Sequence, residues 1–360
     1  MRVSWKLIGV LTLILLGTLS FFVVRFYVRM GGLASIEEEI ALACEPMPAP
    51  PGAEDVAVDA INGIAFVSAH DRRADAGPTG ETPRGGLYLL DMRGNLAGWR
   101  ITPITPHEPV DLRPHGIGYW KGEDGERRLF VVNHGDKGRE SVEIYSVTED
   151  HRLIHQRSVT SPHIVSPNDV AAIGPESFYV TNDHSLPQGI LSLLGDVIAL
   201  GSGDLVHYDG RETRVVAGDQ QFPNGVWVSA DGTRLYLTET LGRSFRIYDR
   251  DRASGALTQE AELYLGTGLD NIAASDDGRL YIGAHPNMIA FLGHASDPSQ
   301  PSPSQVLEVV PDAAGGGAVR TIYLNDGTEI SGLSVAAPYK DWLILDSVFG
   351  DELVVCERPN

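Results

Sequence analysis

The chain beyond residue 43 repeats one arrangement of apolar and polar positions six times. Each copy contains a short run rich in Val, Ile, Leu, Phe and Tyr that follows a turn. The six runs span residues 62–68, 128–134, 177–183, 234–239, 279–285 and 341–346. Apolar runs of this length, bounded by turn residues, predict β-strands rather than helices.

A second motif begins 8 to 13 residues before the start of each of these runs and consists of a polar pair followed by an aliphatic residue. The six copies are Glu54-Asp55-Val56, His115-Gly116-Ile117, Asn168-Asp169-Val170, Asn224-Gly225-Val226, Asp270-Asn271-Ile272 and Ser331-Gly332-Leu333. Successive copies are 46 to 61 residues apart. Explicit hairpin turns, Asp231-Gly232 and Asp277-Gly278, separate some of the strands.

Six units of this size, each a β-meander, predict an all-β fold, a six-bladed β-propeller over residues 44–360. In such a fold the first strand of each blade lines the central channel. The polar pairs would then converge as a ring at one mouth of the channel. The alternative is that Asn, Asp and Gly are ordinary turn residues before strands.

The N-terminus carries one long apolar segment. Residues 7–24 contain no charge, with Arg2 and Lys6 before them and Arg25 and Arg29 after them. Eighteen such residues can span a bilayer core. A cleaved signal peptide is the alternative, but residues 23–27 show no small-x-small cleavage pattern. We therefore predict an uncleaved signal-anchor over 1–30 and a linker over 31–43, with an orientation that the balanced flanking charge leaves open.

Three segments depart from the repeat. Residues 189–200 predict a short helix between blades, either a lid or membrane-facing helix over the mouth or a helix packed in an interblade groove. Segments 71–84 and 293–305 are rich in Asp, Gly, Ser and Pro and predict exposed loops.

Composition and charge narrow the classes of function. The chain is 42% hydrophobic and 21% charged, which is typical of a globular protein. Its 48 acidic residues exceed its 28 basic residues and give a formal charge of -20, which argues against a nucleic acid partner.

The two cysteines, Cys44 and Cys356, lie at opposite ends of the predicted propeller. They are either two unrelated buried thiols or one disulfide. A disulfide would constrain the unfolded chain by roughly 4–5 kcal/mol on the loop-entropy model. It would also require an oxidising compartment. Together with the apolar N-terminus, it would place the propeller on the extracytoplasmic side, membrane-anchored or secreted.

The predicted ring is rich in oxygen ligands. Its carboxylates and carboxamides are those of Glu54, Asn168, Asn224, Asp270 and Asn271. Such a set suits calcium, with magnesium or manganese as alternatives, whereas zinc prefers His and Cys. Asp55 and Asp169 directly follow ring residues and would point deeper into the channel, where they would hold a second cation or cap a turn.

A histidine pair supplies candidate acid–base chemistry. His115 occupies a ring position and His134 ends the matching strand of the same repeat. Such a pair beside a metal could activate water, because His transfers protons well near neutral pH. Asp183 would orient a member of the pair or cap a strand end. The sequence contains no Gly-x-Ser-x-Gly, no phosphate-binding Gly-rich loop and no Cys/His zinc spacing.

Several of these runs resemble the serum paraoxonase/arylesterase family. Glu54-Asp55 and the terminal Cys pair fit as well, so the similarity covers residues 44 to about 356. The runs are Arg113-Pro114-His115-Gly116-Ile117, Val131-Val132-Asn133-His134, Pro167-Asn168-Asp169-Val170, Thr181-Asn182-Asp183-His184, Asn224-Gly225, Asp270-Asn271-Ile272 and His285-Pro286-Asn287. The resemblance implies a six-bladed propeller that binds two calcium ions and hydrolyses lactones and aryl esters.

Carried over residue by residue, the resemblance implies roles for individual positions. The catalytic calcium would be held by Glu54, Asn168, Asn224, Asp270 and Asn271, and the structural calcium by Asp55, Asp169 and the backbone carbonyl of Ile117. His115 and His134 match the family's His pair. The pocket walls would be Phe222, His285, Phe291 and Val348. The resemblance also implies a Cys44–Cys356 disulfide and an uncleaved N-terminus.

The chain departs from the family pattern in two places that shape substrate access. The loop after residues 64–68 is charged (Asp71, Arg72, Arg73, Asp75) and lacks an aromatic residue, and the helical region after His184 is shorter. The family's third, unpaired Cys is absent from the sequence. The resemblance therefore leaves the natural substrate and the oligomeric state open.

The favoured mechanism is metal-assisted hydrolysis of a lactone or ester, a small-molecule substrate, with calcium polarising the carbonyl. The general base would be His115, with His134 relaying the proton, or a metal-bound carboxylate, Glu54 or Asp270. The alternatives are a gluconolactonase-like sugar lactonase, a strictosidine-synthase-like propeller and a non-enzymatic propeller that binds a protein or lipid.

Overall fold

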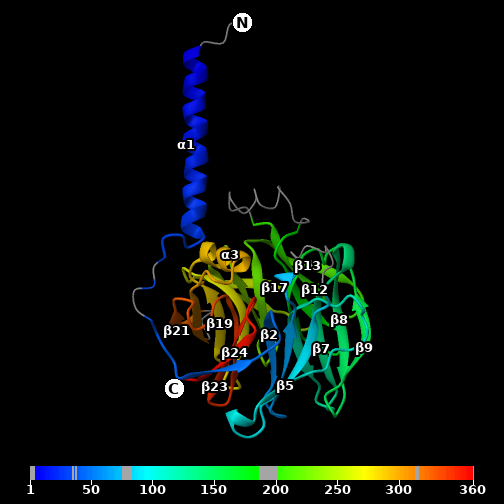
Figure 1. The fold of residues 1–360 in the computed structure, drawn as a ribbon. Helices are drawn as coiled ribbons and strands as arrows, with labels where there is room; N and C mark the ends of the chain where they lie inside the picture. The colour runs from blue at the N-terminus through cyan, green and yellow to red at the C-terminus, as the bar shows by residue number, and fades with distance from the viewer. Residues whose placement is uncertain are drawn as a thin grey trace.

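The fold is a six-bladed β-propeller, as the repeat predicts. The computed structural model describes residues 5–34, 36, 39–74, 83–185, 201–312 and 316–359. These residues form six antiparallel sheets of four strands each around a central axis, with one long helix standing away from the ring (Figure 1).

The chain builds the blades in order, and within each blade the first strand lies at the centre. The first blade consists of β2 (Ala53–Asp59), β3 (Ile64–Ala69), β4 (Gly86–Asp91) and β5 (Arg100–Pro103), and the second of β6 (Pro114–Lys121), β7 (Arg127–Gly135), β8 (Arg139–Val147) and β9 (Leu153–Val159). The third consists of β10 (Pro167–Ala172), β11 (Phe178–Asn182), β12 (Gly203–Tyr208) and β13 (Thr213–Gln220), and the fourth of β14 (Pro223–Val228), β15 (Arg234–Glu239), β16 (Ser244–Arg250) and β17 (Leu257–Tyr264). The fifth consists of β18 (Gly268–Ala274), β19 (Leu280–His285), β20 (Ser304–Pro311) and β21 (Gly317–Asn325). All six runs of the first sequence motif are second strands of blades.

The sixth blade closes the ring with strands from both ends of the propeller. Its order is β22 (Leu333–Tyr339), β23 (Trp342–Ser347), β24 (Glu352–Glu357) and then the N-terminal β1 (Cys44–Pro48). Cys44 pairs with Cys356 in this register, and the two form a disulfide. The pairing that the family resemblance implies is confirmed. The bond joins the outermost strand to its neighbour, so the ring has no open seam.

The hydrophobic core lies between the blades rather than in the central channel. Along β7, Phe130 and Val132 pack toward β11 of the third blade, whereas Leu129 and Val131 pack toward β3 of the first. Both faces of the strand are therefore buried, which explains why the sequence shows continuous apolar runs there rather than strict alternation. Each such side chain contributes about 1.5–3 kcal/mol when fully buried.

Helix α1 (Trp5–Arg29) contains a stretch, Gly9–Arg29, that is long and apolar enough to cross a membrane, and most of the side chains described there are exposed. Its C-terminal end is attached to the rim of the propeller. Met288 N donates to Met30 O at 2.8 Å, and Arg29 Nη2 donates to Leu241 O at 3.0 Å. The helix therefore rises from the rim that carries α3 (Met288–Ser296), as Figure 1 shows.

The predicted helix 189–200 and residues 75–82 of the predicted loop 71–84 lie outside the described residues. The prediction of a loop over 293–305 is wrong at both ends, because helix α3 runs to Ser296 and β20 starts at Ser304. Asn287 begins that helix, since its Oδ1 accepts from the backbone N–H of Ile289 and of Ala290 at 3.1 and 3.0 Å.

Candidate functional site

Every inner strand interrupts its hydrogen-bond ladder with the second strand near its start. The interruptions fall between Ala53 and Asp55, Pro114 and Ile117, Pro167 and Val170, Pro223 and Val226, Leu269 and Ile272, and Leu333 and Ala336. Such β-bulges bend the strand and re-aim side chains. The bulged residues are Glu54; His115 and Gly116; Asn168 and Asp169; Asn224 and Gly225; Asp270 and Asn271; and Ser334 and Val335.

Five of the six predicted polar pairs coincide with these bulges, and the sixth does not. The pair Ser331-Gly332 lies before β22, and Ser334 occupies the bulge instead. The pattern failed here because Leu333 is the last paired residue before the bulge, equivalent to Leu269 of the fifth blade. The motif expects its aliphatic residue after the bulge, but in this blade Leu333 stands before the bulge and Ala336 after it.

Bulged residues from three blades contact one another at the centre. Ser334 Oγ donates to Glu54 Oε1 at 3.0 Å and lies 3.5 Å from Asp270 Oδ1. Asn271 Nδ2 donates to the same Glu54 Oε1, also at 3.0 Å. Ser334, which the sequence analysis missed, therefore joins the sixth blade to the predicted ring.

Four side-chain oxygens of the ring are buried and have no hydrogen-bond partner. They are Glu54 Oε2, Asn168 Oδ1, Asn224 Oδ1 and Asn271 Oδ1, each from a different inner strand. The amide nitrogens of two of these residues are used elsewhere, Asn271 Nδ2 by Glu54 and Asn224 Nδ2 by Thr240 Oγ1 at 3.2 Å. A buried acceptor without a partner costs about 1–3 kcal/mol. A set of oxygens of this kind fits a hard cation such as calcium.

The carboxylates around this ring are strongly coupled. Burial would raise the pKa of Glu54, but the adjacent His115 and the hydrogen bond from Ser334 outweigh it and lower this pKa to about 2. Burial, together with the charges of Asp169 and Glu54, raises the pKa of Asp55 well above its usual value. Burial likewise raises the pKa of Asp169 to about 7. A cation would relieve this crowding of negative charge.

In the described ranges, no three His, Cys, Asp or Glu side chains gather into a metal cluster. The ring is instead a mixed set of carboxylate and amide oxygens, which is the chemistry that calcium accepts and zinc does not prefer.

Asp55 and Asp169 connect neighbouring blades below the ring. Asp55 Oδ2 accepts from the N–H of Ile117 at 2.7 Å, and Asp169 Oδ2 accepts from Val226 N at 2.8 Å. Each donor is the first residue after the bulge of the next blade. Each aspartate also accepts from the residue that follows it, so both satisfy backbone groups as the capping alternative expects. A second cation there stays a prediction.

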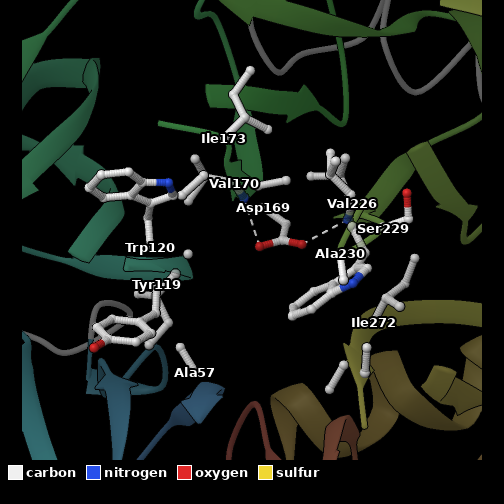
Figure 2. A pocket seen from close by; sticks show the side chains of 18 of the residues that line it. Ala57, Tyr119, Trp120, Asp169, Val170, Ile173, Val226, Ser229, Ala230 and Ile272 are labelled. Atoms are coloured by element: carbon white, nitrogen blue, oxygen red, sulfur yellow. Dashed lines mark hydrogen bonds between the residues drawn. The ribbon is translucent and has the colours of Figure 1, made fainter. Parts of the chain in front are cut away.

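These two aspartates line a cavity of about 480 Å³ between the inner strands. Figure 2 shows Asp169 in this cavity, hydrogen-bonded across to the neighbouring strand, with Tyr119, Trp120 and Val226 around it. The wall combines aliphatic and aromatic side chains with the charged residues Lys121, Asp231, Arg250 and Arg252.

The two predicted catalytic histidines contact each other. His115 Nδ1 and His134 Nε2 are 2.8 Å apart, and His115 Nε2 lies 3.4 Å from Glu54 Oε1. On the far side, His134 Nδ1 lies 2.7 Å from Glu140 Oε2. Burial lowers the pKa of His115, which favours its neutral form. The pair therefore lies in a continuous line from the ring to a carboxylate that the sequence analysis missed.

Asp183 lines the same cavity as this pair, a hollow of about 970 Å³. Its Oδ1 lies 3.1 Å from Nδ1 of His184, and the ring of His184 packs edge-on against Phe222. The carboxylate in contact with the His115–His134 pair is that of Glu140. A role for Asp183 in orienting His184 therefore fits the geometry better than a role in orienting the pair.

The predicted pocket walls extend from the ring to its rim. His285 Nε2 lies 2.6 Å from Asp270 Oδ2, and the His285 ring packs against Phe291 at 4.3 Å between centroids. Phe291 in turn contacts Phe349, and Arg73 lies over the Phe349 ring. The charged loop that departs from the family pattern therefore reaches this wall.

The remaining two wall residues hold their neighbours in place. Phe222 has a left-handed backbone (φ 58°), and its carbonyl accepts from Thr240 N at 2.9 Å. Val348 is 9% exposed, and its N–H donates to Gly332 O at 3.0 Å.

Asp346 is a third residue that the sequence analysis missed. It is completely buried on β23, one oxygen accepts from Ser347 N at 2.7 Å, and the other has no partner. Burial raises its pKa well above the usual value, and the charge of Glu54 adds to this effect. Its position in a second strand, outside the polar-pair motif, gave no signal in the sequence.

Comparisons of the sequence with known protein sequences point to one family. The family model described as Arylesterase matches residues 54–357. Rat serum paraoxonase/arylesterase 1 is 32% identical over 302 residues, covering 83% of this chain and 84% of that protein. Human serum paraoxonase/lactonase 3 is 29% identical over 309 residues, covering 85% of this chain and 86% of that protein.

Solved structures share the fold at lower identity. A luciferin-regenerating enzyme aligns with a TM-score of 0.55 at 13% identity, covering 88% of this chain and 95% of that one. The periplasmic gluconolactonase of Pseudomonas aeruginosa aligns with a TM-score of 0.52 at 15% identity, covering 85% of this chain and 81% of that one. Both are similar to this chain in architecture.

Replacing Gly225 by Ala tests the bulged ring directly. An added Cβ would lie 2.8 Å from both Asn271 Cα and Asp270 O of the next blade. We expect Gly225→Ala to lower stability by about 1–3 kcal/mol, because the inner strands must separate. Gly218→Ala is the matched control, since a Cβ there meets nothing within 4 Å. Equal thermal melting of the two variants would contradict close packing at the ring.

Proposed function

The chain belongs to the arylesterase family, and from that premise we propose that it is a calcium-dependent hydrolase of lactones and of aryl and carboxylic esters. The observation that carries the proposal is the set of four buried, unpartnered oxygens contributed by four inner strands. A site whose inner strands leave four buried acceptors unsatisfied fits a cation.

Two cation sites are proposed. The catalytic calcium would be held by Glu54, Asn168, Asn224, Asp270 and Asn271, and the structural calcium by Asp55, Asp169 and the carbonyl of Ile117. Bound in the ring, calcium would supply a Lewis acid that polarises the carbonyl of the substrate. The other steps fall to the protein's own side chains.

His115 is the proposed general base. Its Nε2 faces the ring beside Glu54, and its pKa is lowered by burial, so it is neutral and able to accept a proton from water. The competing carboxylates fit less well. Glu54 Oε1 already accepts from Ser334 and Asn271, and Asp270 is engaged by His285.

The wall of the site favours apolar substrates over sugars. Phe222, Phe291 and Val348, joined by Phe349, present apolar surfaces beside the ring. An aliphatic or aromatic lactone would bury its chain against them, whereas a polyhydroxylated sugar lactone would lose hydrogen bonds there. This observation favours the lactonase and arylesterase function over the gluconolactonase-like alternative.

We further propose that the propeller lies on the extracytoplasmic side and stays anchored by α1. The disulfide suits an oxidising compartment. The C-terminal end of α1 contacts Gln221, the neighbour of Phe222, through Arg29. An anchored helix would therefore hold the mouth of the site close to the bilayer, where apolar lactones concentrate.

Calcium removal tests the proposed function. We expect hydrolysis of an aliphatic γ- or δ-lactone to stop after EDTA treatment and to return when calcium is added, with magnesium as the control ion. The reason is that the ring oxygens need a cation to place and polarise the substrate. A folded, calcium-stabilised protein with no turnover on any lactone or aryl ester would instead indicate a binding propeller.

Replacing His115 by Gln tests the general base. We expect kcat to fall by about 10²–10⁴-fold, the usual worth of a positioned base, while calcium affinity changes little. His107→Gln, at a His whose side chain is 88% exposed, is the control and should leave kcat unchanged. A loss of less than about tenfold in His115→Gln would move the base role to a carboxylate.

A further inference from the structure

We propose that Glu140 is a positioning residue that fixes the direction of proton transfer through the His115–His134 pair. The inference rests on the proposed function, because it concerns the base of that same hydrolysis. Glu140 belongs to none of the motifs that mark the ring, and it stands at the start of β8, opposite His134 in the β7–β8 register.

Four side chains form one line of contacts from the ring outward. The distances are 3.4 Å from Glu54 Oε1 to His115 Nε2, 2.8 Å from His115 Nδ1 to His134 Nε2, and 2.7 Å from His134 Nδ1 to Glu140 Oε2. The side chain of Glu140 is 19% exposed and that of His134 is 34% exposed. The outer end of the line therefore meets the hollow that Glu140, His134 and Asp183 share.

The carboxylate of Glu140 determines which nitrogens of the His134 and His115 rings carry protons. A carboxylate only accepts hydrogen bonds, so Nδ1 of His134 must be its N–H side. In neutral His134, Nε2 is then an acceptor, and Nδ1 of His115 must donate to it. The Nε2 of neutral His115 then has its lone pair toward the ring. Glu54 Oε1 lies 3.4 Å away and already accepts from Ser334 and Asn271 at 3.0 Å, so it does not require a proton on this nitrogen. Without Glu140, the opposite pair of tautomers would place an N–H toward the water and remove the base.

The proton movements balance along this line. His115 Nε2 takes a proton from the attacking water as its oxygen bonds to the carbonyl carbon. The Nδ1 proton of His115 passes to His134 Nε2, and the Nδ1 proton of His134 passes to Glu140. When the leaving alkoxide is protonated, the same steps run in reverse, or Glu140 releases its proton to solvent and a water protonates the leaving group.

Other charged groups also face the His115–His134 pair. A change in the pH dependence of kcat/KM can therefore be assigned to Glu140 only by comparison with a control variant. These groups are Glu54 on β2, His70 and Arg72 after β3, Arg113 before β6, Arg139 at the β7–β8 turn and Asp183 after β11. Asp136 lies in that same turn, in the 3₁₀ segment Asp136–Gly138, and pairs with Arg113 rather than with the histidines. It therefore supplies a control with the same change of charge.

The first test compares Glu140→Gln with Asp136→Asn in the full chain. We expect Glu140→Gln to lower kcat by about tenfold or more with little change in KM, because substrate contacts remain. Its kcat/KM–pH profile should also differ from that of the wild type, because Nδ1 of His134 then faces an amide instead of a carboxylate. Asp136→Asn should keep the wild-type kcat and profile.

The second test reads the tautomers without turnover. In ¹⁵N-labelled, calcium-loaded protein at neutral pH, NMR of the imidazole nitrogens should show His134 protonated at Nδ1 and not at Nε2. Glu140→Gln should convert this signal to a mixture of tautomers, because the amide can donate as well as accept.

Two outcomes would overturn the inference. One is an active wild type whose kcat and pH profile do not change in Glu140→Gln. The other is a His134 protonated at Nε2 in the wild type. An inactive wild type would count against the proposed function itself, and the NMR result would then decide the role of Glu140 alone.

Discussion

The interruption of the hydrogen-bond ladder in every inner strand is the constraint on which the rest of the structure depends. A bulge turns side chains toward the axis, but it also leaves backbone groups of the inner strand without ladder partners. Side chains of neighbouring blades replace those partners. Thr181 Oγ1 donates to Asn224 O and Thr238 Oγ1 donates to Asp270 O, both at 2.7 Å, and Asp55 and Asp169 accept the freed N–H groups. The same bulges therefore build the ring and hold the blades together.

Such a ring works against the stability of the fold. Buried carboxylates raise one another's pKa, and several buried oxygens lack partners. The apolar clusters between blades and the Cys44–Cys356 closure provide the compensating stability. Departures from local packing rules are expected at functional sites, and here they coincide with the polar-pair motif. A bound cation would pair with these buried oxygens and reduce their destabilising effect, which links metal binding to folding.

Much of the fold and of the ring could be predicted from the sequence, because both depend on local patterns that repeat. Strands buried on both faces give continuous apolar runs, and a bulge aimed at the axis needs polar or small residues at a fixed place. Ser334 was missed because Leu333, which precedes its bulge, resembles the aliphatic residue that follows the bulge in the other blades. Glu140 escaped because its contact depends on the register across a turn containing a 3₁₀ segment. Helix α3 escaped because its Asn287 cap directly follows a strand. The roles assigned to individual ring residues came from the family resemblance rather than from the pattern.

The most direct measurement is a crystal structure of the full chain grown with calcium, with anomalous scattering used to identify the ion. The account predicts a calcium ion in the ring at about 2.3–2.6 Å from Glu54 Oε2 and from the Oδ1 atoms of Asn168, Asn224 and Asn271. Water molecules hydrogen-bonded to those four oxygens, with calcium bound only elsewhere, would contradict it.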